Sequence, residues 1–292
     1  MVLDYDKVKH WPQPDIEQVY TQRDTILYAL GVGVAMDNPV PAADLRYVYE
    51  GVDGKRLQAL PAMAVNLGVG PFWMQDPEAG IDWRRILHGE QYMTLHRPLP
   101  ASGRVIASHS IDEIYDKGEA KGAIAHVRRE IRDADSGEAL ASLVAAVFMR
   151  GNGGFGGSAE GAPRPHPLPE RAPDAVLDLP TRPEQAAIYR LSGDYNPLHV
   201  DPEVATAAGF PKPIFHGLGI YGVAGRALLR LLCDNDPGRL RVMNCRFASP
   251  VFPGETIRTE IWREDEGTAA FRCSVPEREV MVLNNGYAEY TV

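Results

Sequence analysis

The stretch "HGLGIYGVAGRALLRLLCD", residues 216–234, constrains the fold of this chain more than any other. It has the length of a long helix and is apolar on nearly every side, so the helix should be buried rather than lie at the surface. Gly219, Gly222 and Gly225 recur at every third position, and each costs about 1 kcal/mol of helix propensity relative to Ala. This spacing indicates close approach of another backbone, and we expect a sheet wrapped around the helix.

Four strand-like runs follow this helix, separated by Gly, Pro or charged turns. In one of them Ile257, Thr259 and Ile261 alternate with Arg258 and Glu260. Such alternation is typical of a half-buried antiparallel strand, with one face on the core and the other toward water. The second half of the chain therefore predicts an antiparallel sheet that packs on one buried helix.

The first half repeats the order of a helix and four strands in a weaker form. The stretch "RLQALPAMAVNLG", residues 56–68, occupies the place of the long helix, but Pro61 interrupts it. Four strand-like runs follow between residues 89 and 151, and "DADSGEA" between the last two is a hairpin turn by composition. This order predicts an internal duplication with a degraded first copy.

A Gly- and Pro-rich run at residues 151–174 separates the halves. Such a composition builds no helix and pairs poorly in a sheet, so it indicates a linker. Its start, "GNGGFGG", looks like a phosphate-binding loop, but no helix follows, and such loops need a helix N-terminus. The sequence predicts an N-terminal domain at residues 1–150, a linker at 151–174 and a C-terminal domain at 175–292.

The whole-chain properties exclude several classes of protein. A length of 292 residues favours two domains, and a net charge of −9 argues against a nucleic-acid surface. No run approaches the ~18 apolar residues of a membrane span. The start of the chain is charged and lacks a signal peptide, and the end, "AEYTV", carries no peroxisomal tripeptide. We therefore expect a cytoplasmic protein.

The cysteines are widely spaced along the chain and match neither a disulfide framework nor a zinc motif. We expect reduced, mostly packed thiols and no metal site. They are Cys233, Cys245 and Cys273.

The segment "LSGDYNPLHVDP", residues 191–202, carries the candidate catalytic groups. Asp194 and His199 supply a carboxylate and an imidazole, a pair that can move a proton onto and off a water molecule. Asn196 offers a donor and an acceptor and can fix the orientation of the imidazole. The alternative is a plain helix-to-strand connection, because Asp and Asn side chains bond nearby backbone in many turns.

Gly217 strengthens the catalytic interpretation. It opens the buried helix, and its unpaired amide lies at the positive end of the helix dipole. An N–H in that position suits a developing oxyanion on a carbonyl. Proton carriers together with an oxyanion donor indicate chemistry alpha and beta to a thioester or ketone.

The stretch "YRLSGDYNPLHVDPEVATAAGFPKPIFHGL" closely resembles the signature of the R-specific enoyl-CoA hydratases, called hydratase 2, in the MaoC-like group. "LHGEQ", "DKG", "GGFGG" and "RFASP" look like further pieces of the two-domain hydratase 2 of peroxisomal multifunctional enzymes, in the right order over nearly the whole chain. The resemblance implies an α+β double hot-dog fold, in which an antiparallel sheet wraps around a central helix. It also implies an N-terminal helix eroded to admit long acyl chains.

The resemblance also implies roles for single residues. The catalytic residues would be Asp194, His199, the supporting Asn196 and the Gly217 amide; the substrate contacts would be His88, Gly89, Lys117 and Phe247. Each substrate contact has a plainer alternative, since an exposed Lys is often only solvated, a Phe is often only core, and His88 fits a structural hydrogen bond. His216 is expected to cap or pack the helix rather than to transfer protons.

The activity implied is the reversible hydration of (2E)-enoyl-CoA to (3R)-3-hydroxyacyl-CoA in fatty acid metabolism, such as β-oxidation. The family implies no cofactor, no metal, an acyl-CoA thioester as substrate, and a homodimer. Three alternatives stay open: dehydration on a carrier protein or a specialised acyl chain, thioester hydrolysis, and acyl-CoA binding without catalysis.

Overall fold

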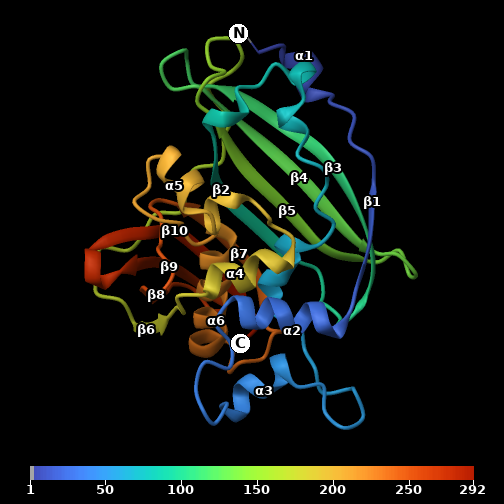
Figure 1. Cartoon of the computed structure of the whole chain (residues 1–292), viewed down its shortest axis with the longest axis vertical. Helices are drawn as coiled ribbons and strands as arrows, with labels where there is room; N and C mark the ends of the chain where they lie inside the picture. Colours follow the sequence, from blue (N-terminus) through green and yellow to red (C-terminus); the bar gives the residue numbers. More distant parts are fainter. Residues whose placement is uncertain (1–2) are drawn as a thin grey trace.

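The computed structural model describes residues 3–292, which form one ten-stranded antiparallel sheet (Figure 1). The first half supplies β1 (Ile16–Tyr20), β2 (Ile86–Leu95), β3 (Gly103–Asp116), β4 (Ala123–Asp133) and β5 (Ala139–Met149). The second half supplies β6 (Ala175–Pro180), β7 (Leu240–Phe247), β8 (Thr256–Arg263), β9 (Thr268–Val275) and β10 (Val280–Tyr290). Strands β2–β5 and β7–β10 confirm the eight predicted runs, whereas β1 and β6 were not predicted.

The strand order repeats between the halves. It is β1-β3-β4-β5-β2 in the first half and, read from the other edge, β6-β8-β9-β10-β7 in the second. Strands β2 and β7 pair at the centre and join the two halves into one sheet. In that pairing Glu90 lies opposite Arg246, and their side chains form an ion pair of 2.6 Å. The repeated order agrees with the predicted duplication.

The helices are α1 (Tyr5–Lys9), α2 (Gln22–Gly31), α3 (Ala42–Val48), α4 (Gln185–Tyr189), α5 (Pro202–Ala207) and α6 (Gly217–Leu232). Helix α6 confirms the predicted buried helix and packs on strands of the second half, with α2 and α4 on the same side of the sheet (Figure 1). The corresponding place in the first half holds only a 3₁₀ helix, η1 (Pro61–Asn66), as the eroded pattern predicted. No helix within residues 3–292 has the length and apolar character needed to cross a membrane.

The glycines of α6 meet helical segments of the first half as well as the expected sheet. A Cβ added to Gly222 would lie 2.5 Å from the side chain of Val32, just past the end of α2. A Cβ on Gly225 would lie 3.3 Å from that of Ala62 in η1. The predicted close approach is therefore found at both positions. The expected sheet neighbour was wrong at Gly222, whereas at Gly225 the side chain of Met243 on β7 also lies close, at 3.5 Å. The glycines let α6 pack against helical segments of the first half, so both halves share one core.

The start of the linker is held by a carboxylate. Asp116, at the end of β3, accepts hydrogen bonds from the amides of Gly118, Gly154 and Gly156 at 2.7–2.8 Å. The "GGFGG" amides that looked able to bind phosphate thus bind a side chain of their own chain. No helix or strand forms between β5 and β6, as expected for residues 151–174.

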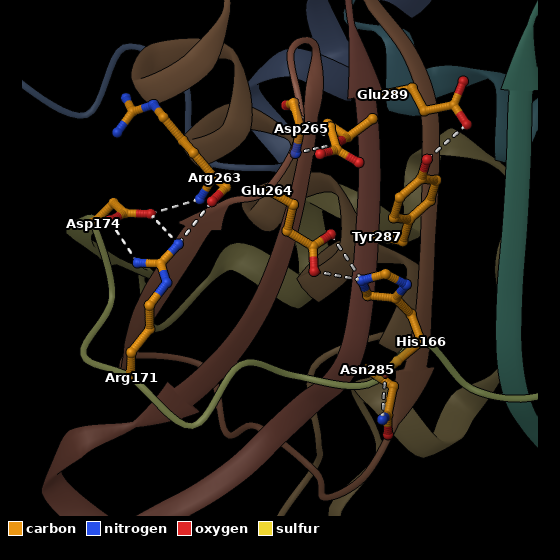
Figure 2. Close-up of polar contacts among 10 residues, drawn as sticks. His166, Arg171, Asp174, Arg263, Glu264, Asp265, Asn285, Tyr287 and Glu289 are labelled. Atoms are coloured by element: carbon orange, nitrogen blue, oxygen red, sulfur yellow. Dashed lines mark hydrogen bonds and ion pairs between the residues drawn. The ribbon is translucent and has the colours of Figure 1, made fainter.

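The rest of the linker is pinned to the second half (Figure 2). The imidazole of His166 lies 2.9 Å from the carboxylate of Glu264, and the side chain of Asn285 donates to the His166 carbonyl at 2.8 Å. Arg171 forms a bidentate ion pair with Asp174. The linker is therefore held in one conformation by these contacts rather than being a flexible connection. The domain limits given above stay a prediction.

Candidate active site

The predicted catalytic segment folds as a pair of side-chain-stabilised turns. The carboxylate of Asp194 accepts from the amide of Asn196, and the side-chain oxygen of Asn196 accepts from the amide of Leu198, both at 3.1 Å. The second bond caps a short 3₁₀ helix, η6 (Pro197–His199), that carries the imidazole. The Asn196 side chain is exposed and orders this turn.

The imidazole of His199 is oriented by a backbone carbonyl. Its Nδ1 lies 2.9 Å from the oxygen of Ile214 and donates to it in the neutral ring. Nε2 is then left with a free lone pair, which is what a general base needs. Within the described chain the Asn196 side chain makes no hydrogen bond to the His199 ring, and its oxygen is bound to the Leu198 amide. The supporting role of Asn196 stays a prediction. Sequence gave no signal for Ile214, since any residue there offers the same carbonyl.

His216 packs directly on His199. The two rings are stacked, with centroids 3.7 Å apart and planes at 28°. His216 Nε2 donates to the backbone oxygen of Asp194 at 3.2 Å, which ties the catalytic turn to the start of α6. His216 occupies the N-cap position, but its side chain makes no capping bond. The packing role expected for His216 is confirmed.

Both stacked imidazoles are buried, with 8% of His199 and 1% of His216 exposed. Burial lowers the pKa of His199, against the Ile214 carbonyl and the Asp194 charge, which raise it. Burial is the main cause that lowers the pKa of His216 to about 3, and the neighbouring His199 is the second. Both rings are therefore neutral at pH 7, and His199 can accept a proton.

The buried imidazoles should make stability depend on pH. His216 has a folded pKa of about 3 and an unfolded pKa of about 6.5, so below about pH 6.5 the unfolded state binds more protons. Its stability contribution is complete above about pH 6.5 and decreases by up to about 1.4 kcal/mol per pH unit as the pH falls. Urea unfolding at pH 7 and pH 5.5 measures this slope.

The control for this slope is a pair of variants. His216→Gln should flatten the slope, whereas His10→Gln should leave it as it is, because the His10 side chain is exposed. An unchanged slope in His216→Gln would show that His216 does not carry the effect.

Gly217 places a free amide beside this cluster. It is the first residue of α6, and within residues 3–292 neither its amide nor that of Leu218 has a hydrogen-bond acceptor. A Cβ on Gly217 would lie 3.4 Å from the ring of Phe247, so the Phe247 ring lies against the helix start. Free amides at a helix N-terminus attract negative charge, as expected for an oxyanion donor.

His88 reaches the same region from the first half. A bulge in β2 adds one residue at Gly89, and the His88 ring lies 4.9 Å from that of Phe247. A Cβ on Gly89 would lie 2.7 Å from the ring of Phe148, so only glycine fits there without a shift. The structure thus brings His88 and Phe247 to the start of the helix at Gly217. The role of His88, Gly89 and Phe247 as substrate contacts stays a prediction.

The His88 side chain is exposed to a cavity, yet the protein around the ring keeps water away from it, and this desolvation lowers its pKa to about 4. The Arg129 charge also lowers this pKa, and the Asp194 charge and the Glu90 carbonyl raise it.

Lys117 lies apart from this cluster. Its ammonium donates to the carbonyl of Ala159 in the linker and lies 5.3 Å from the centre of the Tyr115 ring. No contact of Lys117 within the described chain reaches Asp194, His199 or Gly217. Its role as a substrate contact stays a prediction.

A cavity of about 350 Å³ opens next to His88. Residues 69–74 cover it on one side, and the inner face of β2–β5 forms the other. Its walls are mostly apolar, with Val127, Leu143 and Val147 among them. An apolar cavity beside the catalytic cluster suits an acyl chain.

The cluster of Asp194, His199 and His216 also has the spacing of a metal site. Asp194, His199 and His216 each offer a donor atom, and these atoms lie within 4.8 Å of one another. The two imidazole rings, however, are stacked face to face, whereas metal ligands direct their ring edges at one ion. His199 Nδ1 and His216 Nε2 donate to carbonyl groups, which leaves His199 Nε2 and His216 Nδ1 as the ring atoms open to a ligand. The stacking of the two rings favours proton transfer over metal binding.

Comparison with known proteins gives consistent matches over the chain. Residues 165–284 match the model of the MaoC like domain, and residues 19–151 match that of the MFE-2 hydratase 2 N-terminal domain. The chain is 42% identical to 3-hydroxyacyl-thioester dehydratase Y of Mycobacterium tuberculosis, over 99% of both chains. It is 37% identical to the peroxisomal enoyl-CoA hydratase 2 of Arabidopsis thaliana, over 94% of this chain and 92% of that one.

A solved structure agrees with these matches. The crystal structure of a MaoC-like dehydratase from Phytophthora capsici superimposes with a TM-score of 0.85 at 36% sequence identity. The superposition covers 98% of each chain. The similarity therefore extends over both halves of the sheet.

Proposed function

The chain belongs to the MaoC-like dehydratase family in its two-domain hydratase 2 form, and on that premise we propose that it hydrates (2E)-enoyl-CoA reversibly to (3R)-3-hydroxyacyl-CoA. It is accordingly a hydro-lyase. The observation that carries the proposal is the neutral, carbonyl-oriented His199 beside Asp194 and the free Gly217 amide.

Asp194 and His199 hold one water molecule in this proposal. The Asp194 carboxylate and Nε2 of His199 each accept a hydrogen bond from it, which directs its oxygen at Cβ of the substrate. Because Nδ1 of His199 is bound to Ile214, only Nε2 is free to face the water. The two groups act as a pair and share the acid and base roles.

The addition then proceeds across the double bond. The water oxygen forms a bond to Cβ, and the π electrons move through Cα toward the thioester oxygen as a proton passes from the water to the pair. The Gly217 amide stabilises the charge on that oxygen. The pair returns a proton to Cα from the same face, so the elements of one water are added. No electron transfer is involved, and the step needs no redox cofactor.

Substrate placement follows from the same arrangement. The acyl chain enters the cavity beside His88, and Phe247 lies between the cavity and the amide of Gly217. A homodimer and a cytoplasmic location stay predictions.

The first test is the ultraviolet loss of the enoyl thioester on mixing with trans-2-enoyl-CoAs of increasing length, followed by chiral analysis. We expect the (3R) alcohol. Release of free CoA would instead indicate a thioesterase, and intact enoyl-CoA bound without product would indicate a binding protein. Turnover of enoyl thioesters only on a carrier protein would confirm the hydration reaction but would identify the carrier-protein thioester, rather than the CoA thioester, as the substrate.

A further inference from the structure

The cavity beside His88 contains a positive charge without a negative partner. Arg129 projects from β4 into the cavity, and its one hydrogen bond within residues 3–292 is to the backbone oxygen of Val65, at 2.7 Å. Burial lowers the pKa of Arg129 to about 10, and no carboxylate raises it. Its neighbour Arg128, by contrast, is paired with Asp112 and Glu130.

Two more polar groups in the cavity lack partners. Nε2 of Gln13 and Nε2 of His109 are buried, line the same cavity and have no hydrogen-bond partner among the residues that the structure describes. His109 lies directly opposite Arg129 in the β3–β4 pairing. Buried polar groups are almost always satisfied, so two unsatisfied groups beside a guanidinium without a carboxylate partner indicate a polar ligand.

The backbone positions of Arg129 and His88 are separated along the cavity wall. His88 is opposite Val147 on β5, whereas Arg129 is opposite Leu143, four positions along the same strand, or about 13 Å. Arg129 is also on β4, two strands from β2, or about 10 Å away across the sheet. A ligand that enters past His88 can therefore extend along the cavity wall to Arg129.

We propose that the cavity takes acyl groups that end in a carboxylate, so that the substrate is the CoA thioester of a dicarboxylic enoic acid of medium length. This inference rests on the proposed hydratase function. The free N–H groups of Arg129 bind the terminal carboxylate, and the amide of Gln13 supplies a further donor. An unsubstituted acyl chain would leave the guanidinium unpaired in an apolar space.

The test compares trans-2-decenoyl-CoA with its analogue that carries a carboxylate at the far carbon. We expect kcat/KM of the unmodified protein to favour the carboxylated substrate by about tenfold or more, the effect of a hydrogen bond to a charged group. Arg129→Met should abolish this preference and keep or raise the rate on decenoyl-CoA. Arg128→Met is the matched control and should keep the preference, because Arg128 is paired outside the cavity.

Two outcomes would overturn the inference: equal rates of the unmodified protein on both substrates, or an equal loss on both in Arg129→Met, which would assign Arg129 a structural role through Val65. If neither substrate reacts, the hydratase function fails instead.

Calorimetric binding of saturated decanoyl-CoA and its carboxylated analogue then tests the inference by itself. Tighter binding of the analogue that is lost in Arg129→Met supports it, and equal binding overturns it.

Discussion

Asp194→Asn should lower kcat for the hydration of trans-2-enoyl-CoA by about 10²- to 10⁴-fold, the contribution of a positioned acid–base group. The variant keeps the shape of the turn, because the amide oxygen of Asn can still accept from the backbone of Asn196. It removes the negative charge that holds and polarises the water. Stopped-flow rates measure kcat, and calorimetry with a saturated acyl-CoA should show unchanged binding.

Asp201 provides the matched control for this variant. Its carboxylate caps α5 by accepting from the amide of Glu203 at 2.9 Å, and Asn is an equally good cap. Asp201→Asn should therefore keep full activity. The double variant Asp194→Asn with His199→Gln should lose little more than the single variants, since the two groups act on one water. Full activity of Asp194→Asn would exclude the mechanism.

Gly217→Pro should lower kcat by about 10²- to 10³-fold, the effect of removing one oxyanion donor. Proline is tolerated at the first position of a helix, where the missing N–H has no intrahelical partner. The preceding residue, His216, has ψ near 134°, which suits a residue before proline. The substitution thus deletes one amide and leaves α6 intact, as circular dichroism and the unfolding midpoint should show.

Gly217→Ala separates the amide from the added bulk. Its Cβ would meet the Phe247 ring at 3.4 Å, an ordinary contact, and the N–H remains. This variant should keep most of the activity. Equal losses in Gly217→Ala and Gly217→Pro would mean that crowding against Phe247, rather than a lost donor, is responsible.

The elements that were predictable are those with a strong local pattern. The apolar run of α6 and the alternating runs of β2–β5 and β7–β10 each carry their own burial signal in the sequence. Strands β1 and β6 are short edges of five and six residues, and their pairing partners lie far along the chain. Helix α2 shows no apolar stripe, and its place beside α6 depends on tertiary contacts.

The site divides in the same way. Asp194, His199 and Gly217 were predictable because a carboxylate, an imidazole and a glycine at a helix start each suggest their role by residue type. The structure brings all three to the start of α6. Contacts made through backbone atoms were beyond prediction, as with the Ile214 carbonyl that orients His199. Arg129 was missed for another reason. A charged residue in a polar-looking strand gives no sign of its lack of a partner until the register is known.

The repeated strand order means that the chain is a covalently fused pair with broken symmetry. In a pair of identical subunits, every substitution would occur twice, and erosion of one helix would also remove the helix that presents the Gly217 amide. Fusion lifts that restriction: one copy retains the helix and the proposed proton-transfer groups, and the other has only a 3₁₀ helix beside a cavity of about 350 Å³. Substrate preference can therefore evolve through the first half of the chain without disturbing the chemistry in the second.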